Sequence, residues 1–253
     1  MILGSSRLLD SRDCERPEWV SVNRRMAGLE SLLQPFWFRP MMKITRIRRR
    51  LGYGCFTRSW EYPWALLGAD LKPGMRVLDI GSGGSAFPLL LALDGFEVQS
   101  ADPSLDHGAQ WLDWRKRLAR SLGIASGWGL PARSPNGRFK VTYVPYSIQN
   151  LRYGDGYFDR VFCLSVMEHI PEREWETCMA QMARVLVQGG RLVMTLDMGA
   201  VEANDRQYEK LLVEPTLKLS GSIDYAVPIS LRDKQARHPG HGYETLGLIW
   251  DKV

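Results

Sequence analysis

From about residue 69 onward, short apolar runs alternate with segments in which apolar residues recur at helical spacing. Apolar runs of about four to eight residues between turn residues are typical of buried strands. The predicted strands span residues 76–80, 96–101, 140–144, 157–164, 190–196, 222–229 and 245–253. The predicted helices span residues 87–93, 105–122 and 171–187, with a loop over 123–138. Alternating strands and helices of this length predict an α/β fold with a doubly wound, mostly parallel, seven-stranded, Rossmann-like sheet.

The helix over residues 171–187 carries the strongest pattern. Pro171 suits a helix start, and Gly189 is of the residue type that follows helix ends. One face of the segment carries four apolar residues, namely Trp175, Met179, Met182 and Leu186. This stripe predicts a helix that packs against the sheet.

Composition places the chain among ordinary soluble proteins. Its 253 residues are 45% hydrophobic and 24% charged, enough for one large domain with a full core. No apolar run approaches the roughly 18–20 residues of a membrane span. The four cysteines are Cys14, Cys55, Cys163 and Cys178. They form no C-x-x-C pair and no cluster with the four histidines at the spacing of metal ligands. We therefore expect reduced packing cysteines, a cytoplasmic protein and no metal site.

Positive charge is concentrated near the N-terminus. Residues 1–60 hold 12 Lys or Arg against 5 Asp or Glu, whereas the remaining 193 residues have a net charge of −2. The formal net charge of +5 therefore comes entirely from the N-terminal segment. The basic segment 43–50 is expected to form an amphipathic helix. Such a helix suits a membrane surface or an anionic substrate, and the commoner alternative is a solvated face over a core contact.

A glycine-rich turn follows the first strand of the core domain. Gly81-Ser82-Gly83-Gly84-Ser85-Ala86 satisfies the pattern G-x-G-x-x-G/A, and Asp102 ends the next strand about 20 residues further on. Two classes of nucleotide-binding protein share that arrangement, so by itself it selects neither. A purely structural turn is the alternative that three glycines after a buried strand disfavour.

Asp79, just before the first glycine, separates the two classes. A carboxylate at this position would repel the anionic pyrophosphate of a dinucleotide. S-adenosylmethionine has no phosphate, and its amino-acid end carries an α-ammonium close to a cationic sulfur. The acid therefore favours a sulfonium ligand over a dinucleotide.

Four motifs together resemble those of the class I S-adenosylmethionine-dependent methyltransferases. V-L-D-I-G-S-G-G (77–84) is similar to the first motif of the family, and D-P-S (102–104) is similar to its ribose-binding acid. F-D-R-V-F-C-L-S-V-M-E-H-I (158–170) resembles its fourth strand, and R-V-L-V-Q-G-G-R-L-V (184–193) resembles its Gly-Gly turn and fifth strand. The motifs occur in the order of the family over residues 75–197. The resemblance implies S-adenosylmethionine as cofactor and S-adenosylhomocysteine as product.

The resemblance also implies that the methionine end of the cofactor lies against the glycine turn and the end of the fourth strand. The residues that it assigns to this end are Asp79, Gly81, Ser82, Gly83, Ser165 and Val166. The resemblance further implies a basic helical cap over residues 1–65 on a core domain over 66–253. Tyr62 and Arg58 are expected to reach the methionine carboxylate from this cap, and the alternative is that the aromatic residues of segment 58–64 simply pack.

The ribose and the adenine are assigned to the second and third strands. Asp102 is expected to bind both ribose hydroxyls, since a carboxylate has two acceptor oxygens, and Pro103 to line the adenine edge. The family often has an acid after the third strand that accepts from the adenine amino group. Here the matching pair is Ser147-Ile148, so the Ser147 hydroxyl and the Ile148 backbone are expected to pair the adenine edge.

Glu168 and His169 follow the fourth strand, where an acceptor is expected to lie. His169 is the candidate catalytic residue, because histidine takes up a proton near neutral pH and suits the role of base toward a hydroxyl. The alternative is that the pair begins a loop and caps the next helix. For Glu168 we favour that structural role.

The sequence limits the acceptor less than the cofactor. Ser165-Val166-Met167-Glu168 stands where methyltransferases of base amines typically carry D/N-P-P-Y/F, which argues against a nucleic acid, although the basic segment leaves RNA open. We predict O-methylation of a small molecule or glycan by in-line displacement. The alternatives are an NAD(P)-dependent oxidoreductase on a Rossmann fold and a non-catalytic S-adenosylmethionine-binding partner subunit.

Overall fold

The structure is a computed structural model that describes residues 6–8, 11–33, 57–83, 85–103, 125–126, 140–198, 207–212, 214–221 and 244–253. Three predicted features lie outside the described residues: the helix over 105–122, the strand over 222–229 and the basic segment 43–50. The other predicted strands and helices are present, with the bounds given below.

The described strands form one sheet. They are β1 (Arg7–Leu8), β2 (Arg76–Ile80), β3 (Glu97–Ala101), β4 (Ala125–Ser126), β5 (Lys140–Val144), β6 (Phe158–Leu164), β7 (Leu186–Met198), β8 (Leu217–Leu219) and β9 (Glu244–Lys252). Their order is β1-β9-β7-β6-β2-β3-β5-β4, and β8 pairs with β9. Strands β2 to β7 pair in parallel, whereas β9 runs antiparallel to β1, β7 and β8. The doubly wound, mostly parallel α/β fold is confirmed, and the short strands β1, β4 and β8 widen the predicted sheet.

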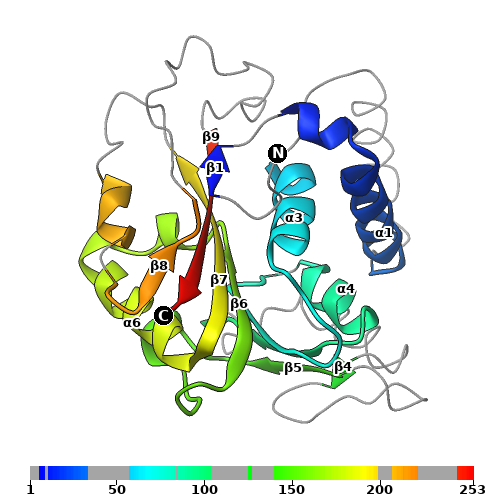
Figure 1. Cartoon of the computed structure of the whole chain (residues 1–253). Helices are drawn as coiled ribbons and strands as arrows, with labels where there is room; N and C mark the ends of the chain where they lie inside the picture. Colours follow the sequence, from blue (N-terminus) through cyan, green and yellow to red (C-terminus); the bar gives the residue numbers. More distant parts are fainter. Residues whose placement is uncertain are drawn as a thin grey trace.

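Helices cover both faces of this sheet. Figure 1 shows α1 (Pro17–Leu33), α3 (Thr57–Gly68) and α4 (Phe87–Leu93) on one face and α6 (Trp175–Val185) on the other. Short 3-10 turns complete the described elements: η1 (Ser11–Glu15), η4 (Ile148–Asn150), η5 (Met167–His169), η6 (Glu172–Glu174) and η7 (Gln207–Leu212). Neighbouring strand residues alternate between two apolar clusters, so that Phe162 belongs to one face and Cys163 to the other.

The predicted helix over 171–187 is shorter than expected at both ends. The chain forms the 3-10 turn η6 before α6 begins at Trp175, and β7 already begins at Leu186. Leu186 pairs with Phe158, after which the register of the β6–β7 pair shifts. Gly189 lies in this irregularity with φ +73°. Gly189 therefore marks a bulge in a strand and not the end of a helix.

The described part of the predicted cap packs into the core of the sheet. Trp19 of α1 and Trp60 of α3 are fully buried in the same cluster as Phe162 of β6. The short strand β1 extends the sheet beside β9. The predicted boundary at residue 65 falls inside α3, so one continuous helix joins the two predicted units.

A proline inside α3 determines how α1 docks. Pro63 has no N–H, so the carbonyl of Ser59 loses its helical donor. Asn23 of α1 donates its side-chain amide to that carbonyl, at 2.8 Å from Nδ2 to O. This bond between the two helices satisfies the carbonyl and fixes α1 against α3.

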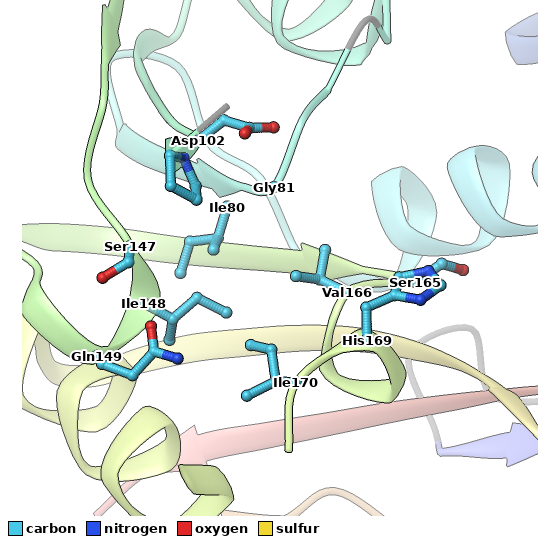
Figure 2. Close-up of a pocket in the computed structure, with 11 residues that line it drawn as sticks. Ile80, Gly81, Asp102, Ser147, Ile148, Gln149, Ser165, Val166, His169 and Ile170 are labelled. Carbon is cyan, nitrogen blue, oxygen red and sulfur yellow. The ribbon is translucent and has the colours of Figure 1, made fainter. Parts of the chain in front are cut away.

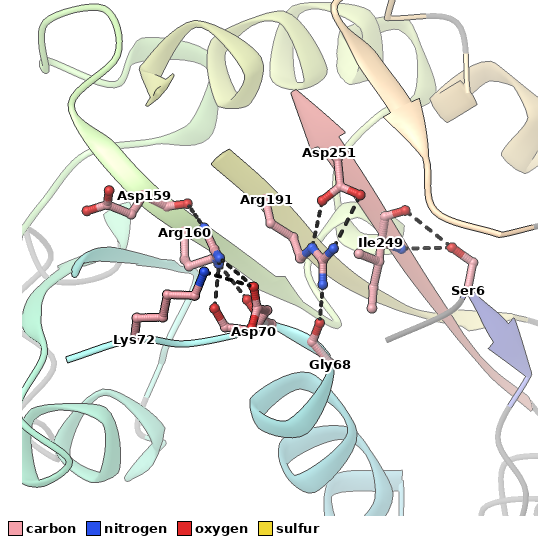
Figure 3. A network of polar contacts seen from close by, with 10 residues as sticks. Ser6, Gly68, Asp70, Lys72, Asp159, Arg160, Arg191, Ile249 and Asp251 are labelled. Atoms are coloured by element: carbon pink, nitrogen blue, oxygen red, sulfur yellow. Dashed lines mark hydrogen bonds and ion pairs between the residues drawn. The ribbon is translucent and has the colours of Figure 1, made fainter. Parts of the chain in front are cut away.

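Two arginines hold the C-terminal end of α3. Arg160 of β6 donates to the carbonyl of Asp70, and Arg191 of β7 donates to the carbonyl of Gly68, each at 2.8 Å (Figure 3). Arg191 also pairs with Asp251 of β9 at 2.7 Å. The last carbonyls of a helix have no partner within the helix, and cations there are favourable. The arginines therefore fasten α3 to three neighbouring strands.

Among the three cysteines that the structure describes, one is oxidised, contrary to expectation. Cys55 lies outside the described residues. Cys14 is disulfide-bonded, so the expectation of a reduced residue is wrong there. Cys163 and Cys178 are free and buried, as packing residues are expected to be. Among the described residues, no helix has the length and apolar character needed to cross a bilayer.

Candidate functional site

A cavity of about 310 Å³ opens beyond the carboxyl ends of β2, β3 and β6. In doubly wound sheets this edge is where ligands bind. Eight of the predicted site residues line the cavity. Three come from β2 and β3 or follow them directly, namely Gly81, Asp102 and Pro103, and five follow β5 or β6, namely Ser147, Ile148, Ser165, Val166 and His169.

The labelled side chains divide the cavity into two ends. Figure 2 shows Ser147 and Gln149 on one side and Val166 and His169 on the other, with Asp102 between them along the wall. The implied assignment places the adenine at the first end and the methionine and methyl acceptor at the second. Each end therefore presents the residues that the sequence assigned to it.

The backbone of Gly81 forms the floor of the cavity next to Val166. Gly81 has φ +68°, and its N–H donates to the carbonyl of Ala101 at 2.8 Å. A Cβ at this position would come within 2.5 Å of Val166 Cγ2. Only glycine meets both demands, because other residues rarely adopt this φ and have a Cβ to place.

Two further polar contacts join the glycine turn to β3 and the residue that follows it. The Gly83 N–H donates to Asp102 Oδ2 at 2.7 Å, and the Ser100 hydroxyl donates to the Ser82 hydroxyl at 2.7 Å. Ser82 and Gly83 do not themselves line the cavity, and their contacts instead fix the turn and the Asp102 carboxylate. The carboxylate stays at the wall of the cavity, where the ribose is expected.

Asp79 is buried behind the turn, and its Oδ2 has no hydrogen-bond partner within the described residues. Burial and the nearby Asp102 carboxylate raise the pKa of Asp79 well above its usual range, against the opposing effect of the Arg58 cation. A buried acid without a partner is costly to ionise. A ligand that brings a positive charge here would relieve that cost, so the site fits the ammonium of the implied cofactor and does not fit a pyrophosphate.

Helix α3 carries three polar residues near the site, namely Arg58, Glu61 and Tyr62. Tyr62 stacks on Phe87 of α4 with ring centroids 5.2 Å apart. Burial raises the pKa of Tyr62 to about 12, so it remains a neutral hydroxyl. Arg58 donates to Glu61 Oε2 at 2.7 Å. Tyr62 does not line the cavity, and it holds α3 against α4.

At the adenine end, Ile148 is buried and Ser147 is half-buried at the start of η4. Gln149, which the sequence analysis did not name, also lines the cavity and donates its side-chain amide to Glu174 Oε2 at 2.7 Å. The signal in the sequence that could have identified Gln149 was its position directly after Ser147-Ile148. Among the described residues, the polar side chains that line this end are therefore a hydroxyl and an amide, and the lining carboxylate, Asp102, lies further along the wall.

At the acceptor end, His169 is exposed on η5 and lines the cavity. Glu168 does not line the cavity and accepts from the Asp197 N–H of β7 at 3.2 Å. The expected capping role is wrong, because neither η6 nor α6 has a side-chain cap hydrogen bond. Burial, with a smaller contribution from Asp197, raises the pKa of Glu168 to about 8. Burial and Glu61 raise the pKa of Asp197 to about 6, against the opposing effect of Thr245, Arg58 and His169.

Sequence reasoning also missed a buried carboxylate at the edge of the site. Glu61 lies within the aromatic segment 58–64 and is fully buried against the ends of β6 and β7, where Ser165 and Thr195 donate to it. Its neighbours in sequence gave no sign of this, because both partners lie more than 100 positions away. Ile80 and Ile170 also line the cavity and were not named as site residues, although each lies inside a quoted motif.

Within the described part of the chain, no group of three or more His, Cys, Asp or Glu residues is arranged to hold a metal ion. The absence of a metal site stays a prediction for the whole chain.

Comparison with known proteins agrees with the fold and the motifs. Residues 78–194 match the family model described as "Methyltransferase domain". Methyltransferase GfsG of Streptomyces halstedii is 30% identical over 126 residues, which are 49% of this chain and 38% of that protein. Ubiquinone biosynthesis O-methyltransferase of Chromobacterium violaceum is 26% identical over 188 residues, which are 71% of this chain and 70% of that protein. The match to the first relative therefore spans well under half of its length.

Solved structures share the fold at lower identity. Geranyl diphosphate C-methyltransferase from Streptomyces coelicolor A3(2), in complex with Mg²⁺, geranyl diphosphate and S-adenosyl-L-homocysteine, aligns with a TM-score of 0.54 and 13% identity. The alignment covers 78% of this chain and 82% of that chain. At this identity the likeness shows the fold alone.

Proposed function

Because residues 78–194 belong to the class I S-adenosylmethionine-dependent methyltransferase family, we propose that the protein transfers a methyl group from S-adenosylmethionine to a hydroxyl of a small molecule or sugar. The product from the cofactor is S-adenosylhomocysteine. The observation that carries most weight is the buried, unpartnered Oδ2 of Asp79 behind a glycine turn that opens into the cavity. A cationic ligand supplies what that oxygen lacks.

When bound, the cofactor supplies a methyl group on a sulfonium, which is already activated for in-line displacement. The protein has to align an acceptor and exclude water, since holding two reactants in line supplies much of the rate. Asp102 and Ser147 would hold the nucleoside, and Asp79 and the glycine turn the amino-acid end. His169 would take the hydroxyl proton as the oxygen–carbon bond forms and the carbon–sulfur bond breaks.

The preference for a hydroxyl acceptor is supported by the exposed position of His169 and by the name of one relative, which is an O-methyltransferase. A base adds rate where the acceptor has a proton of high pKa. A dehydrogenase that uses NAD(P) is disfavoured, because the pyrophosphate would face Asp79. A non-catalytic partner subunit would bind the same cofactor, so it would differ from the proposed enzyme only in lacking turnover. We also propose that the protein is located in the cytoplasm.

The test is a screen that follows S-adenosylhomocysteine release from S-adenosylmethionine over panels of hydroxyl, amine and carbon acceptors. We expect release with members of the hydroxyl panel only. Release with amines or carbon nucleophiles alone would correct the acceptor class. Tight cofactor binding without release over any panel would favour the partner-subunit alternative.

A further inference from the structure

Glu61 is a buried carboxylate outside the set of residues that touch the cavity. It is fully buried on α3, yet it accepts from three side chains. Arg58 donates to Oε2 at 2.7 Å, Thr195 donates to Oε1 at 2.6 Å, and the Ser165 hydroxyl donates to the same Oε1. A buried charge is tolerated where it is fully paired in this way. Burying this charge nevertheless costs free energy, and Glu61 incurs that cost at the edge of the candidate site.

The Ser165 backbone requires support from its neighbours. Ser165 has φ +50°, which is uncommon for a residue with a side chain, and it lines the cavity directly after β6. Such strain persists where the surroundings hold it and is concentrated at functional sites. The Ser165 N–H donates to both the carbonyl and the hydroxyl oxygen of Thr195, at 3.0 and 3.1 Å.

Glu61 fixes the direction of both hydroxyl groups. A carboxylate only accepts, so the hydroxyls of Ser165 and Thr195 must both point their hydrogens at it. The lone pairs of Thr195 Oγ1 are thereby left to accept the Ser165 N–H. This closed set of bonds holds Ser165 in its conformation and, with it, the wall formed by Val166.

Glu61 also restrains Arg58, the only described cation whose charge opposes the raised pKa of Asp79. The Arg58 side chain is 48% exposed, so it is not enclosed by its bond to Glu61. One carboxylate therefore holds both a residue of the cavity wall, Ser165, and the cation that acts on Asp79.

We propose that Glu61 is a positioning residue for the methionine end of the cofactor, which it orders by holding Ser165 and Arg58 in place. The proposal rests on the proposed use of S-adenosylmethionine. It predicts an effect confined to one end of the ligand. The ribose and adenine contacts come from Asp102 and Ser147, which share no hydrogen bond with Glu61 in the described structure.

The test compares two ligands by calorimetry on the full chain. S-adenosylhomocysteine carries the amino-acid end, and 5′-methylthioadenosine lacks it. Glu61→Gln should weaken S-adenosylhomocysteine binding by about tenfold or more, as expected for loss of a bond to a charged group. Its affinity for methylthioadenosine should change less than about twofold. Asp102→Ala, as the control, should weaken both ligands together.

A matched pair at position 195 keeps the test independent of the Glu61 variant. Thr195→Val removes the hydroxyl without changing the volume and should reproduce the selective loss, whereas Thr195→Ser should bind like the wild type. Equal losses for both ligands in Glu61→Gln and Thr195→Val would reduce Glu61 to a structural residue and overturn the inference, as would no loss for either. A wild-type protein that binds neither ligand would instead overturn the proposed function, and this inference with it.

Discussion

The backbone of Gly81 and the side chain of Val166 lie in contact, so that a Cβ at residue 81 would come within 2.5 Å of Val166 Cγ2. The contact closes the floor of the cavity between β2 and β6. We expect Gly81→Ala to destabilise the protein by about 2 kcal/mol or more, because it adds overpacking to an unfavourable φ. Chemical denaturation measures the loss.

Gly83→Ala is the matched control for that substitution. Gly83 also has positive φ, +51°, but a Cβ there meets nothing within 4 Å. Gly83→Ala should therefore lose only the free energy of unfolding that the unfavourable φ costs. The difference between the two variants then gives the cost of the clash with Val166. Adding Val166→Ala to Gly81→Ala should recover that difference. Equal losses at the two glycines, with no recovery, would show that Val166 does not limit position 81.

Asp79→Asn should stabilise the cofactor-free protein while removing cofactor binding. The folded pKa of Asp79 is raised, above an unfolded value of about 3.9. Its stabilising contribution is therefore complete below about pH 4 and is lost as the pH rises through the folded pKa. The asparagine imitates the protonated form. Its advantage in melting temperature over the wild type should be near zero at pH 4 and grow toward pH 8.

The opposite result is equally measurable. If the melting temperature of Asp79→Asn falls below that of the wild type as the pH rises, the carboxylate is ionised and already paired in the free protein. The cofactor would then meet no unpartnered carboxylate oxygen at Asp79.

Gly247 of β9 makes room for Trp64 of α3. A Cβ at residue 247 would lie 2.6 Å from the ring, which is held in the core beside Trp60. Gly247→Ala should cost about 1–3 kcal/mol through overpacking. Gly28→Ala in α1, where a Cβ meets nothing within 4 Å, should stabilise by up to about 1 kcal/mol. Urea titrations of both variants check this, and a Gly247→Ala protein as stable as wild type would contradict the packing.

His169→Ala should bind the cofactor as the wild type does and lose turnover by about 10²–10⁴. The deficit should shrink at high pH, where a hydroxyl acceptor ionises without help. Single-turnover rates over a pH series measure it once the screen has supplied an acceptor. Wild-type rates at every pH would make His169 a structural loop residue and leave alignment as the source of the rate.

Turnover should need no added metal, because displacement at a sulfonium does not call for a Lewis acid. A chelator should leave S-adenosylhomocysteine release unchanged. Loss of release with chelator and its return with Mg²⁺ would show that the chain, or its acceptor, depends on a metal.

The parts of the fold that depend on local pattern were predictable. β2, α4 and β5 have the expected bounds, since each is a short apolar segment between turn residues. The end of α6 was not, because Gly189 serves a bulge that forms only when β7 pairs with β6. The strands β1 and β8 are too short to give a periodic signal.

The same division holds for the candidate site. Asp79 and Gly81 belong to one motif and Asp102 to the next, and the structure brings them together at one sheet edge. Glu61 could not be found in this way, because its meaning depends on Ser165 and Thr195, which meet it only in the folded chain. Tyr62 was assigned to the ligand and instead packs on Phe87, a contact that local sequence does not reveal.

The most direct measurement is calorimetric titration of the wild-type chain with S-adenosylhomocysteine and, separately, with NAD. Asp79 favours a ligand with an ammonium and opposes one with a pyrophosphate. We predict saturable one-to-one binding of S-adenosylhomocysteine, lost in Asp79→Asn, and no binding of NAD. Binding of NAD without binding of S-adenosylhomocysteine would contradict the proposed function and make the chain a dinucleotide-binding protein.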